Sequence, residues 1–419
     1  MRKAFSVLVL SGLLLMTTLF SAGRAHAANT NKDRLIHTFT PAPNGYPRSG
    51  LVADAAGNLY GTAYGNYRSC PNSCGEVFEL SPGANGGFQY RVLHTFTKGA
   101  GDGIFPQGAL VQDAQGNIYG TTLDGGADGY GTVYELSPTP IGPWNETILY
   151  SFKDGFDGAY PNSGVILDTA GNLYGVTEGG GSGGTPDPVN VGTVFELSLV
   201  NGVWVENILH AFVWNTADGN YPWGIAFDAS GNLWGVTPLG GPLDYGTVYE
   251  LIRDENWKEN IVYDFQYGDD GYQPVSTLVF DSAGNIYGTA WLGGGSPDGG
   301  LVFELTPSSG GTWTEQILHS FTGTPDGFRP FSGLTFDQAG NLYGTTEGGG
   351  APCNCGTVFE MSPAADGSWT ESIVYSFEPT AKDGRFPMGN VIFGPGSLLY
   401  GATNEGGPKG AGTVFEVKP

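Results

Sequence analysis

The sequence predicts an all-β fold, a seven-bladed β-propeller with four-stranded blades, in which the N-terminal strand completes the last blade and closes the ring. Three observations predict it: a phrase that recurs seven times, four strand signals in each repeat, and an offset between the two ends of the chain. The 419 residues include 71 glycines and 27 prolines, and only 14% are charged. This composition is typical of many short turns, so we expect short strands and no long helices.

The repeated phrase reads Asp-x-x-Gly-Asn-Leu/Ile-Tyr/Trp-Gly in most copies, as in residues 113–120. Its aromatic residue recurs at intervals of 53 to 60 residues, at Tyr60, Tyr119, Tyr174, Trp234, Tyr287, Tyr343 and Tyr400. A period of this length indicates a repeat architecture. The main alternative is a solenoid, but parallel β-helices usually repeat over far fewer residues, which favours a propeller.

Each repeat carries four strand signals separated by turn residues, which is the strand content of one propeller blade. In the second copy they lie at residues 109–113, 117–121, 131–136 and 144–152. The Asp and Gly of the phrase form a tight turn between the first two strands, because Gly adopts a backbone conformation that other residues resist. We therefore interpret the phrase as scaffold. The seventh copy has Gly-Pro-Gly-Ser-Leu-Leu at 394–399, so we expect one blade to turn differently.

The two ends of the chain are offset by one strand relative to the repeat. Residues 35–40 (LIHTFT) match the fourth strand of a blade, and residues 412–417 (GTVFEV) match the third. A closed ring would complete its last blade by pairing these two segments, which removes the exposed strand edges. An open solenoid does not explain this offset.

These repeats, with GN[LI]YGT, a glycine-rich loop, GTV[FY]EL and WxExI, resemble the GloVer tandem repeat of exported bacterial proteins often called choice-of-anchor proteins. The resemblance covers nearly the whole chain after its first 27 residues. It implies export and a repeat domain whose partner is generally unknown. It supplies no catalytic residues.

The first 27 residues predict a cleaved signal peptide, with Arg2 and Lys3, an apolar stretch at 4–20 and Ala-His-Ala at 25–27. A membrane anchor is the competing interpretation, but the polar segment that follows favours cleavage. We therefore expect a signal peptide at 1–27, a short segment at 28–34, and one propeller domain at 35–419. The protein should be exported to the periplasm or the medium, with no further membrane span.

The charge of the chain argues against nucleic acid as a partner. Cleavage would remove Arg2, Lys3 and Arg24 but no acid, which changes the formal net charge from −24 to −27. Phosphate binding needs clustered Lys and Arg. We expect a monomer with an unknown glycan, peptide or protein as its ligand.

Propeller connectivity predicts which loops carry a function. Because successive strands are antiparallel, the loops between strands two and three, and between strand four and the next blade, share one face, here called the long-loop face. It includes the long segments 176–192 and 265–274. Binding residues concentrate in such loops, so we expect a binding surface on this face and at the mouth of the central channel.

The connection into each first strand carries a second motif, Asp/Asn-Gly followed by Pro. Its residues are Asn44, Asp102, Asp157, Asp218, Asp270, Asp326 and Asp383. The simplest interpretation is turn formation by Asp-Gly. The alternative is that the six carboxylates ring the channel side of this face as binding residues and hold Ca²⁺, the only cofactor that these residues suggest.

Aromatic positions divide into repeated and unrepeated ones. His37, His94, His210 and His319 share a repeat position with tyrosines, which indicates a packing position with a polar tip. The repeated tryptophans are expected to pack blades together. Three unrepeated tryptophans lie in or beside the long loops and are candidates for stacking on sugar rings: Trp214, Trp223 and Trp291.

The cysteines form two close pairs, Cys70 with Cys74 and Cys353 with Cys355. Export predicts disulfides, and we expect a local staple in each loop, because Cys74 and Cys355 are equivalent positions on blades that are not neighbours. The short Cys-x-Cys spacing leaves open that the second pair is reduced or reactive. The separation of the pairs argues against a four-thiolate zinc site.

Two functions remain after these steps. The first is a non-catalytic binding or scaffolding propeller that uses its long-loop face. The second is a metal-assisted hydrolase or lyase acting on polysaccharide, for which one acid or base should break the repeat. The breaks are Glu178, Glu347, Glu405, Arg48, Arg329 and Arg385. They form no recognisable catalytic set, so we favour binding and name no catalytic residue.

Overall fold

The computed structural model describes residues 34–41, 45–65, 70, 73–99, 101–139, 143–181, 190–214, 218–254, 256–295 and 298–419. The chain divides into two units, Met1–Thr30 and Asn31–Pro419, and every strand below belongs to the second. The predicted signal peptide lies outside the described residues. None of the described helices has the length and hydropathy needed to cross a membrane.

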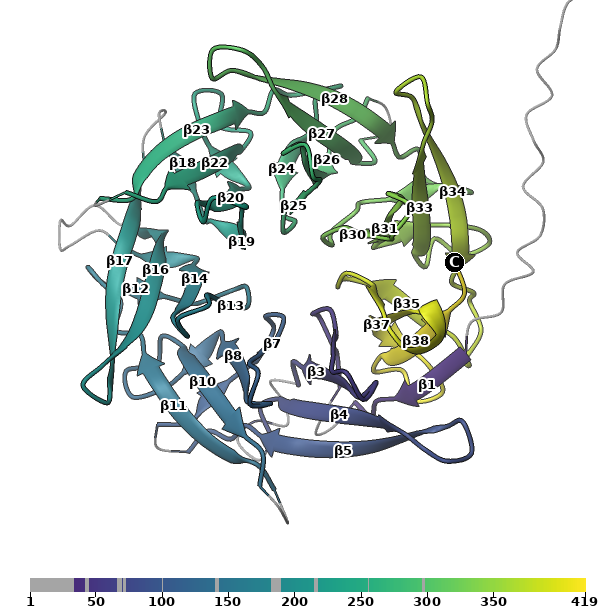
Figure 1. The fold of residues 1–419 in the computed structure, drawn as a ribbon. Coiled ribbons are helices and arrows are strands. Elements are labelled where there is room, and N and C mark those ends of the chain that lie inside the picture. Colours follow the sequence, from purple (N-terminus) through teal and green to yellow (C-terminus); the bar gives the residue numbers. More distant parts are fainter. Residues whose placement is uncertain are drawn as a thin grey trace, which may run out of the picture. The chain divides into compact units, whose positions relative to one another are not determined.

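The described residues of the second unit form seven antiparallel sheets arranged as the blades of a propeller, as the sequence predicts (Figure 1). In blades 1 to 4 and in blade 6 the strands pair in chain order from the channel outward, whereas in blades 5 and 7 two short inner strands pair with the same neighbour. Blade 1 comprises β2 (Val52–Ala53), β3 (Leu59–Ala63), β4 (Glu76–Pro82) and β5 (Phe88–Thr95). Blade 2 comprises β7 (Val111–Gln112), β8 (Ile118–Thr122), β10 (Thr132–Ser137) and β11 (Asn145–Ser151). Blade 3 comprises β13 (Ile166–Leu167), β14 (Leu173–Thr177), β16 (Asn190–Val200) and β17 (Val203–Val213).

The remaining blades repeat this order. Blade 4 comprises β19 (Trp223–Phe227), β20 (Leu233–Thr237), β22 (Thr247–Ile252) and β23 (Lys258–Asp264). Blade 5 comprises β24 (Tyr272–Pro274), β25 (Val279–Phe280), β26 (Ile286–Leu292), β27 (Leu301–Pro307) and β28 (Trp313–Ser320). Blade 6 comprises β30 (Thr335–Phe336), β31 (Leu342–Thr346), β33 (Thr357–Pro363) and β34 (Trp369–Ser376).

Blade 7 confirms the predicted closure of the ring. It comprises β35 (Gly384–Pro387), β36 (Ile392–Phe393), β37 (Leu399–Gly406), β38 (Thr413–Val417) and the N-terminal strand β1 (Arg34–Thr38). Strand β1 pairs antiparallel with β38, with Leu35 opposite Phe415 and Thr38 opposite Thr413. Figure 1 shows the purple β1 beside the yellow β38. The outer edge of blade 7 is therefore the N-terminal segment.

The hydrophobic cores lie between blades. Each of the seven main clusters of buried residues combines side chains from two neighbouring blades. Between blades 1 and 2, for example, Tyr60 and Phe96 pack with Ile118 and Trp144. The repeated tryptophans pack there as expected: the Tyr60 and Trp144 rings are 6.1 Å apart, and the equivalent pair between blades 4 and 5 is 5.4 Å apart. Burial of one such side chain contributes about 1.5–3 kcal/mol.

The repeated phrase is a hydrogen-bonded turn, as predicted. In blade 3, Oδ1 of Asp168 accepts the backbone N–H groups of Ala170 and Asn172, and Oδ2 accepts the Asn172 amide and the Tyr174 hydroxyl. Although burial raises the pKa of Asp168, these hydrogen bonds lower it below its ordinary value. Gly171 adopts a φ of +91°. Asp, Gly, Asn and Tyr of the phrase are thus all used by the turn itself.

The glycine that ends the phrase is required for close packing and not for the turn. A Cβ on Gly120 would lie 2.4 Å from the Tyr134 hydroxyl oxygen, so the aromatic ring of the third strand can lie over the second only at a glycine. The seventh turn differs, as expected. Residues Pro395–Ser397 form a 3₁₀ turn (η1), and the Tyr400 hydroxyl donates to the Pro395 carbonyl instead of an Asp.

The turn role of Asp168 gives a stability prediction. Replacing it in Asp168→Ala removes four hydrogen bonds and should lower the free energy of unfolding by about 1–3 kcal/mol. Thermal and denaturant unfolding would measure the change. Thr169→Ala, an exposed residue of the same turn, is the control and should change little. Equal effects of the two substitutions would contradict the role assigned to the carboxylate.

Candidate functional site

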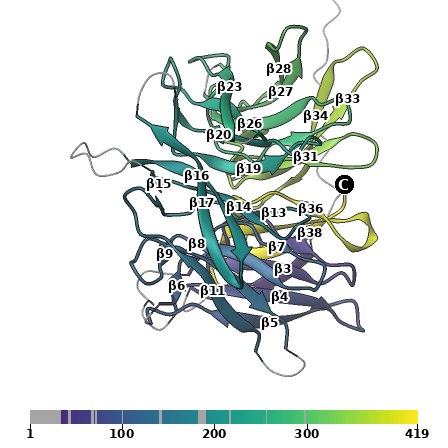
Figure 2. The same ribbon diagram turned by 60° about the vertical axis from the view of Figure 1, so that its left-hand side comes forward.

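The long-loop face is built from two loops that pair with each other. The connection into blade 2 forms β6 (Gly103–Ile104), which pairs with β9 (Asp124–Gly125) of the loop after β8. The same pairing joins β12 (Gly158–Ala159) to β15 (Gly179–Gly180), β18 (Gly219–Asn220) to β21 (Leu239–Gly240), and β29 (Gly327–Phe328) to β32 (Gly348–Gly349). In Figure 2, β6, β9 and β15 lie on the same side of the ring. The two kinds of loop therefore share one face, as the connectivity predicts.

The residue before the proline of each connection has a left-handed backbone. Its φ lies between 54° and 70° in all seven repeats, at Tyr46, Phe105, Tyr160, Tyr221, Gln273, Arg329 and Phe386. Residues with a side chain rarely adopt such a φ, and functional sites often carry this strain. Hydrogen bonds hold the conformation: the Phe105 N–H donates to the Cys74 carbonyl of blade 1, and the Leu123 N–H of blade 2 donates to the Phe105 carbonyl. Five of the seven side chains are aromatic. The sequence analysis did not identify these positions, although each one directly precedes a repeated proline and could have been found by that.

The residues that follow the same prolines line the channel mouth. They enclose a hollow of about 90 Å³, and no two of the seven are of the same type: Arg48, Gln107, Asn162, Trp223, Val275, Phe331 and Met388. A second, more apolar hollow of about 270 Å³ includes Leu110, Ile225 and Leu334. Identical scaffold positions thus carry different side chains where the blades converge.

Two of the three candidate tryptophans meet at this mouth. Trp223 and Trp291 both make edge-on contacts with Phe331, at ring separations of 5.7 and 6.4 Å. The Arg329 guanidinium lies 4.8 Å from the centre of the Trp291 ring, and the indole N–H of Trp291 donates to Glu347. These contacts use much of the surface of both indoles. The sequence placed all three tryptophans near long loops but did not indicate this cluster.

The third tryptophan belongs to an exposed arc on the same face. Trp214 is 52% exposed, and two further aromatics occupy the connections on either side of it: Phe156, 76% exposed, and Tyr267, 65% exposed. The three residues lie in the connections between blades 2 and 3, 3 and 4, and 4 and 5. Among the described residues, these are the three most exposed aromatic side chains.

A pocket lies on the same face, between the connections into blades 3 and 4. It has a volume of about 330 Å³, and its lining includes Tyr160, Tyr221, Asp154 and Glu178. Burial raises the pKa of Glu178 above its ordinary value. Residues 182–189 of the long segment 176–192 lie outside the described residues. A larger hollow, of about 600 Å³, lies among the turns of the opposite face and is lined by Asp337, Phe393 and other turn residues.

The six candidate aspartates do not converge on the channel; each is held between the outer strands of two neighbouring blades. Asp102 shows the arrangement: Oδ2 accepts the backbone N–H and the hydroxyl of Thr97, within its own turn. Oδ1 faces His94 of β5 and Glu146 of β11. The expected carboxylate ring on the channel side is therefore wrong, because each carboxylate is anchored by its turn. Asp157, Asp218, Asp270, Asp326 and Asp383 are anchored in the same way.

Each of these interblade sites joins the Asp to the shared His/Tyr position of one blade and, in five of them, to the Glu of WxE in the next. In the tyrosine sites, the Tyr150 hydroxyl lies 3.0 Å from Asp157 and 2.9 Å from Glu206, and Tyr263 contacts Asp270 and Glu315 at 2.5 and 3.0 Å. The histidine sites comprise His94, Asp102 and Glu146; His210, Asp218 and Glu259; and His319, Asp326 and Glu371. The polar tip predicted from the sequence is thus the centre of a polar contact between blades.

The ionisation of the Glu depends on which residue it meets. Burial, reinforced by the nearby Asp157 carboxylate, raises the pKa of Glu206 to about 9, and burial and Asp270 do the same for Glu315. In the histidine sites, burial raises the pKa of Glu146 only to about 7, because His94 opposes the shift. The raised pKa values favour the protonated form of Glu206 and Glu315 at neutral pH. His37 differs: it stacks on Tyr90, and burial lowers its pKa to about 4.

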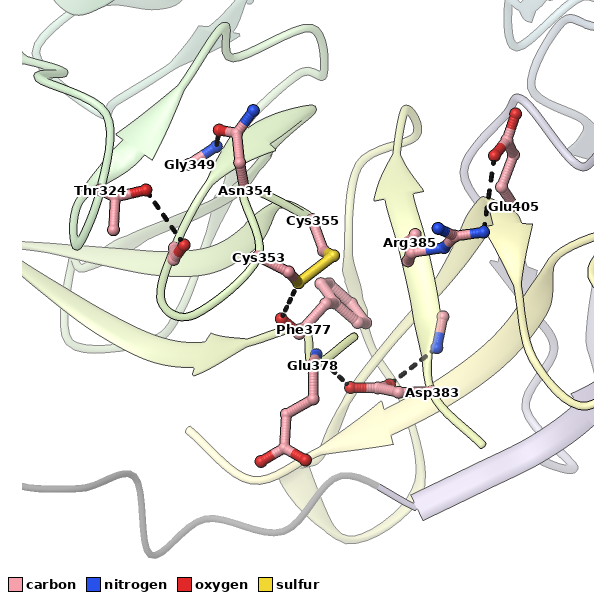
Figure 3. The surroundings of a disulfide bond; sticks show 12 residues. Thr324, Gly349, Cys353, Asn354, Cys355, Phe377, Glu378, Asp383, Arg385 and Glu405 are labelled. Atoms are coloured by element: carbon pink, nitrogen blue, oxygen red, sulfur yellow. Dashed lines mark hydrogen bonds and ion pairs between the residues drawn. A yellow bond between two sulfur atoms is a disulfide. The ribbon is translucent and has the colours of Figure 1, made fainter. Parts of the chain in front are cut away.

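The cysteines form the two local disulfides that the sequence predicts, Cys70–Cys74 and Cys353–Cys355. Figure 3 shows the second, with Cys353 Sγ 3.3 Å from the Phe377 carbonyl oxygen and near the turn in which the Glu378 N–H donates to Asp383. The carbonyls of Cys74 and Cys355 accept the N–H groups of Phe105 and Phe386. Both disulfides therefore staple a loop that anchors the next blade.

The tyrosine sites predict a loss of stability in alkali. A raised pKa in the folded state means that the stabilising contribution of Glu206 and Glu315 is complete below pH 4.5 and is lost as the pH rises towards 9. The melting midpoint should fall between pH 7 and 9. The double variant Glu206→Gln and Glu315→Gln, which mimics the protonated acids, should lose roughly half as much or less. The exposed Glu378→Gln is the control; an unchanged pH dependence in the double variant would contradict the assignment.

Comparison with known proteins agrees with the repeat. The sequence matches the Gloeobacter/Verrucomicrobia repeat in two tandem stretches, residues 18–187 and 183–415. None of the curated proteins compared with the chain matches it. Because the two stretches cover nearly the whole chain and coincide with the propeller, this protein belongs to the Gloeobacter/Verrucomicrobia repeat family.

Proposed function

We propose that the protein is exported and acts as a non-catalytic binding module, which holds carbohydrate along an arc of its long-loop face over blades 2 to 5. One observation carries this proposal: the exposed aromatics Phe156, Trp214 and Tyr267 occupy consecutive connections of that face. Exposing a large aromatic side chain in each of three consecutive connections is unfavourable unless a ligand covers them, and proteins usually avoid exposing apolar surface in this way.

The chemistry of the pocket fits a sugar. The rings of Tyr160 and Tyr221 offer apolar faces for the C–H surface of a pyranose, and the carboxyl groups of Asp154 and Glu178 accept hydroxyl hydrogens. A few polar groups among aromatic walls are typical of small-ligand sites. The spacing of the arc over several blades favours a chain of sugars over a single one.

Catalysis has weaker support. Two of the three glutamates that break the repeat have a partner within their own blade or its neighbour: Glu347 accepts the Trp291 indole N–H, and Glu405 lies 3.9 Å from Arg385. Glu178 lines the pocket together with Asp154, but a glycosidase needs two carboxyl groups at a defined separation across a bound sugar. We therefore assign no catalytic residue.

Export has two supports of different kinds. The sequence of residues 1–27 has the charged start, apolar stretch and small-residue cleavage motif of a signal peptide. The two disulfides favour an oxidising compartment such as the periplasm or the medium. An exported acidic protein with an aromatic face is suited to polysaccharide outside the cytoplasm.

A binding screen with soluble polysaccharides tests the proposal. Calorimetry or affinity electrophoresis should identify a glycan that the protein binds without releasing reducing ends. Trp214→Ala and Tyr160→Ala should each weaken binding by roughly tenfold, since each removes a stacking surface. The control is Val203→Ala, an exposed apolar residue at the start of β17, beside the hairpin turn on the opposite face. Binding that survives both aromatic substitutions, or that the control weakens equally, would contradict the site, and cleavage of the glycan would overturn the non-catalytic assignment.

A further inference from the structure

The interblade sites between blades 1 and 2 and between blades 3 and 4 have longer spacings around their His than the sites with Tyr and Glu have around their hydroxyl. The site between blades 5 and 6 is closer, with His319 Nε2 3.2 Å from Asp326 Oδ2, which is within hydrogen-bond distance. In the two tyrosine sites that contain a Glu, those of Tyr150 and Tyr263, the hydroxyl lies 2.5 to 3.0 Å from both carboxylates, which are hydrogen-bond distances. In the site between blades 1 and 2, Nε2 of His94 lies 3.6 Å from Asp102 Oδ1 and 3.4 Å from Glu146 Oε1. These distances are too long for good hydrogen bonds. They are close to the separation of about 3.3 Å that two ligands have on one tetrahedral zinc ion with bonds of about 2.0–2.1 Å.

The facing atoms of this site are buried and unsatisfied. Nε2 of His94, Oδ1 of Asp102 and Oε1 of Glu146 are inaccessible to solvent, and none has a hydrogen-bond partner among the described residues. All three atoms lie within 4.8 Å of one another. The other oxygen of Asp102 is used by the turn at Thr97, which fixes the carboxylate. Buried polar atoms without partners are unfavourable. A ligand bound between these three facing atoms would satisfy all of them.

The charge of the site indicates a cation. Two carboxylates and one imidazole face each other, and among the described residues no Lys or Arg forms an ion pair with either carboxylate. With a neutral imidazole and both carboxyl groups ionised, the site would carry two negative charges in a partly buried place, which a divalent ion would neutralise. Packing fixes the orientation of the histidine rings. The rings of His94, His210 and His319 each pack edge-on against the Phe two residues later, with ring centres 4.6 to 4.8 Å apart.

We propose that the three histidine sites bind Zn²⁺ between blades 1 and 2, 3 and 4, and 5 and 6. In the first site the ligands are Nε2 of His94, Oδ1 of Asp102 and Oε1 of Glu146, with a water molecule in the fourth position. The equivalent ligands come from His210, Asp218 and Glu259, and from His319, Asp326 and Glu371. Ca²⁺ fits less well, because it needs six to eight oxygen ligands and does not favour imidazole.

The tyrosine sites and His37 are internal controls for this proposal. At Tyr150 and Tyr263 a hydroxyl that keeps its proton occupies the place of the imidazole and hydrogen-bonds both carboxylates. At His37 the partner is the stacked Tyr90 ring. The fold therefore accepts either His or Tyr at this position, and a His-to-Tyr substitution removes a metal ligand while keeping a residue that the same position naturally uses.

The experiment is a metal count on the tag-free protein. After removal of metal with a chelator and desalting, Zn²⁺ titration at pH 7.5, followed by calorimetry and elemental analysis, should give three bound ions, and Zn²⁺ should raise the melting midpoint. H94Y, H210Y and H319Y should each lose one ion, and the triple variant should lose all three while its midpoint without metal stays close to that of the wild type. H37Y should still bind three ions.

Three outcomes would overturn the proposal. One is a wild-type protein that binds no Zn²⁺ in the titration and shows no thermal shift when Zn²⁺ is added. Another is a triple variant that binds as many ions as the wild type, which would place the metal on surface carboxylates. The last is a loss of metal in H37Y equal to that in H94Y. If the triple variant is unfolded, the three single variants still decide the question, because each should lose only its own ion.

Discussion

No blade of this protein buries its own faces, and the rest of the structure depends on that constraint. Each hydrophobic cluster is shared by two neighbouring blades, so a single four-stranded sheet would leave apolar surface exposed on both sides. Seven such interfaces need a closed ring, and closure needs the β1–β38 pairing. The Asp turn and the glycine of each phrase serve the same end, since they let the aromatic residues of neighbouring strands and blades pack closely.

This scaffold explains why the two faces differ. On one face, the side chains of the repeated phrase are used by the hydrogen bonds of the Asp turns. The residue types at these positions therefore vary little from blade to blade. On the other, each connection is anchored to the preceding blade through the backbone of the residue before the proline, as at Phe105. Because the backbone carries the anchoring, the side chains that follow are free to differ, and they do so around the channel mouth. A uniform backbone therefore presents a non-uniform surface.

The polar contacts between blades add a second set of links to the apolar ones. A buried carboxylate pair is unfavourable unless a proton, a positive charge or a metal ion lies between the two groups. At Tyr150 a proton separates the two carboxyl groups, because burial raises the pKa of Glu206 and favours its protonated form. In the site between blades 1 and 2 the imidazole nitrogen of His94 lies 3.6 and 3.4 Å from the two carboxylates, which is further than the Tyr150 hydroxyl lies from its two carboxylates. Alternation of Tyr and His around the ring thus gives interfaces of similar shape but different chemistry.

The sequence by itself determined the strand content, the number of blades, the closing strand, the local disulfides and the face that carries the long loops. It could do so because these features follow from local turn chemistry and from a period that seven copies repeat. Only the tertiary structure decided where the Asp carboxylates point. Asp102 meets His94 and Glu146, which are eight residues before it and 44 residues after it, and no local pattern encodes that encounter. The contacts of Trp223 and Trp291 with Phe331, and the exposure of Trp214, were likewise decided by how neighbouring blades pack, because the fraction of a side chain that reaches solvent depends on contacts distant in the chain.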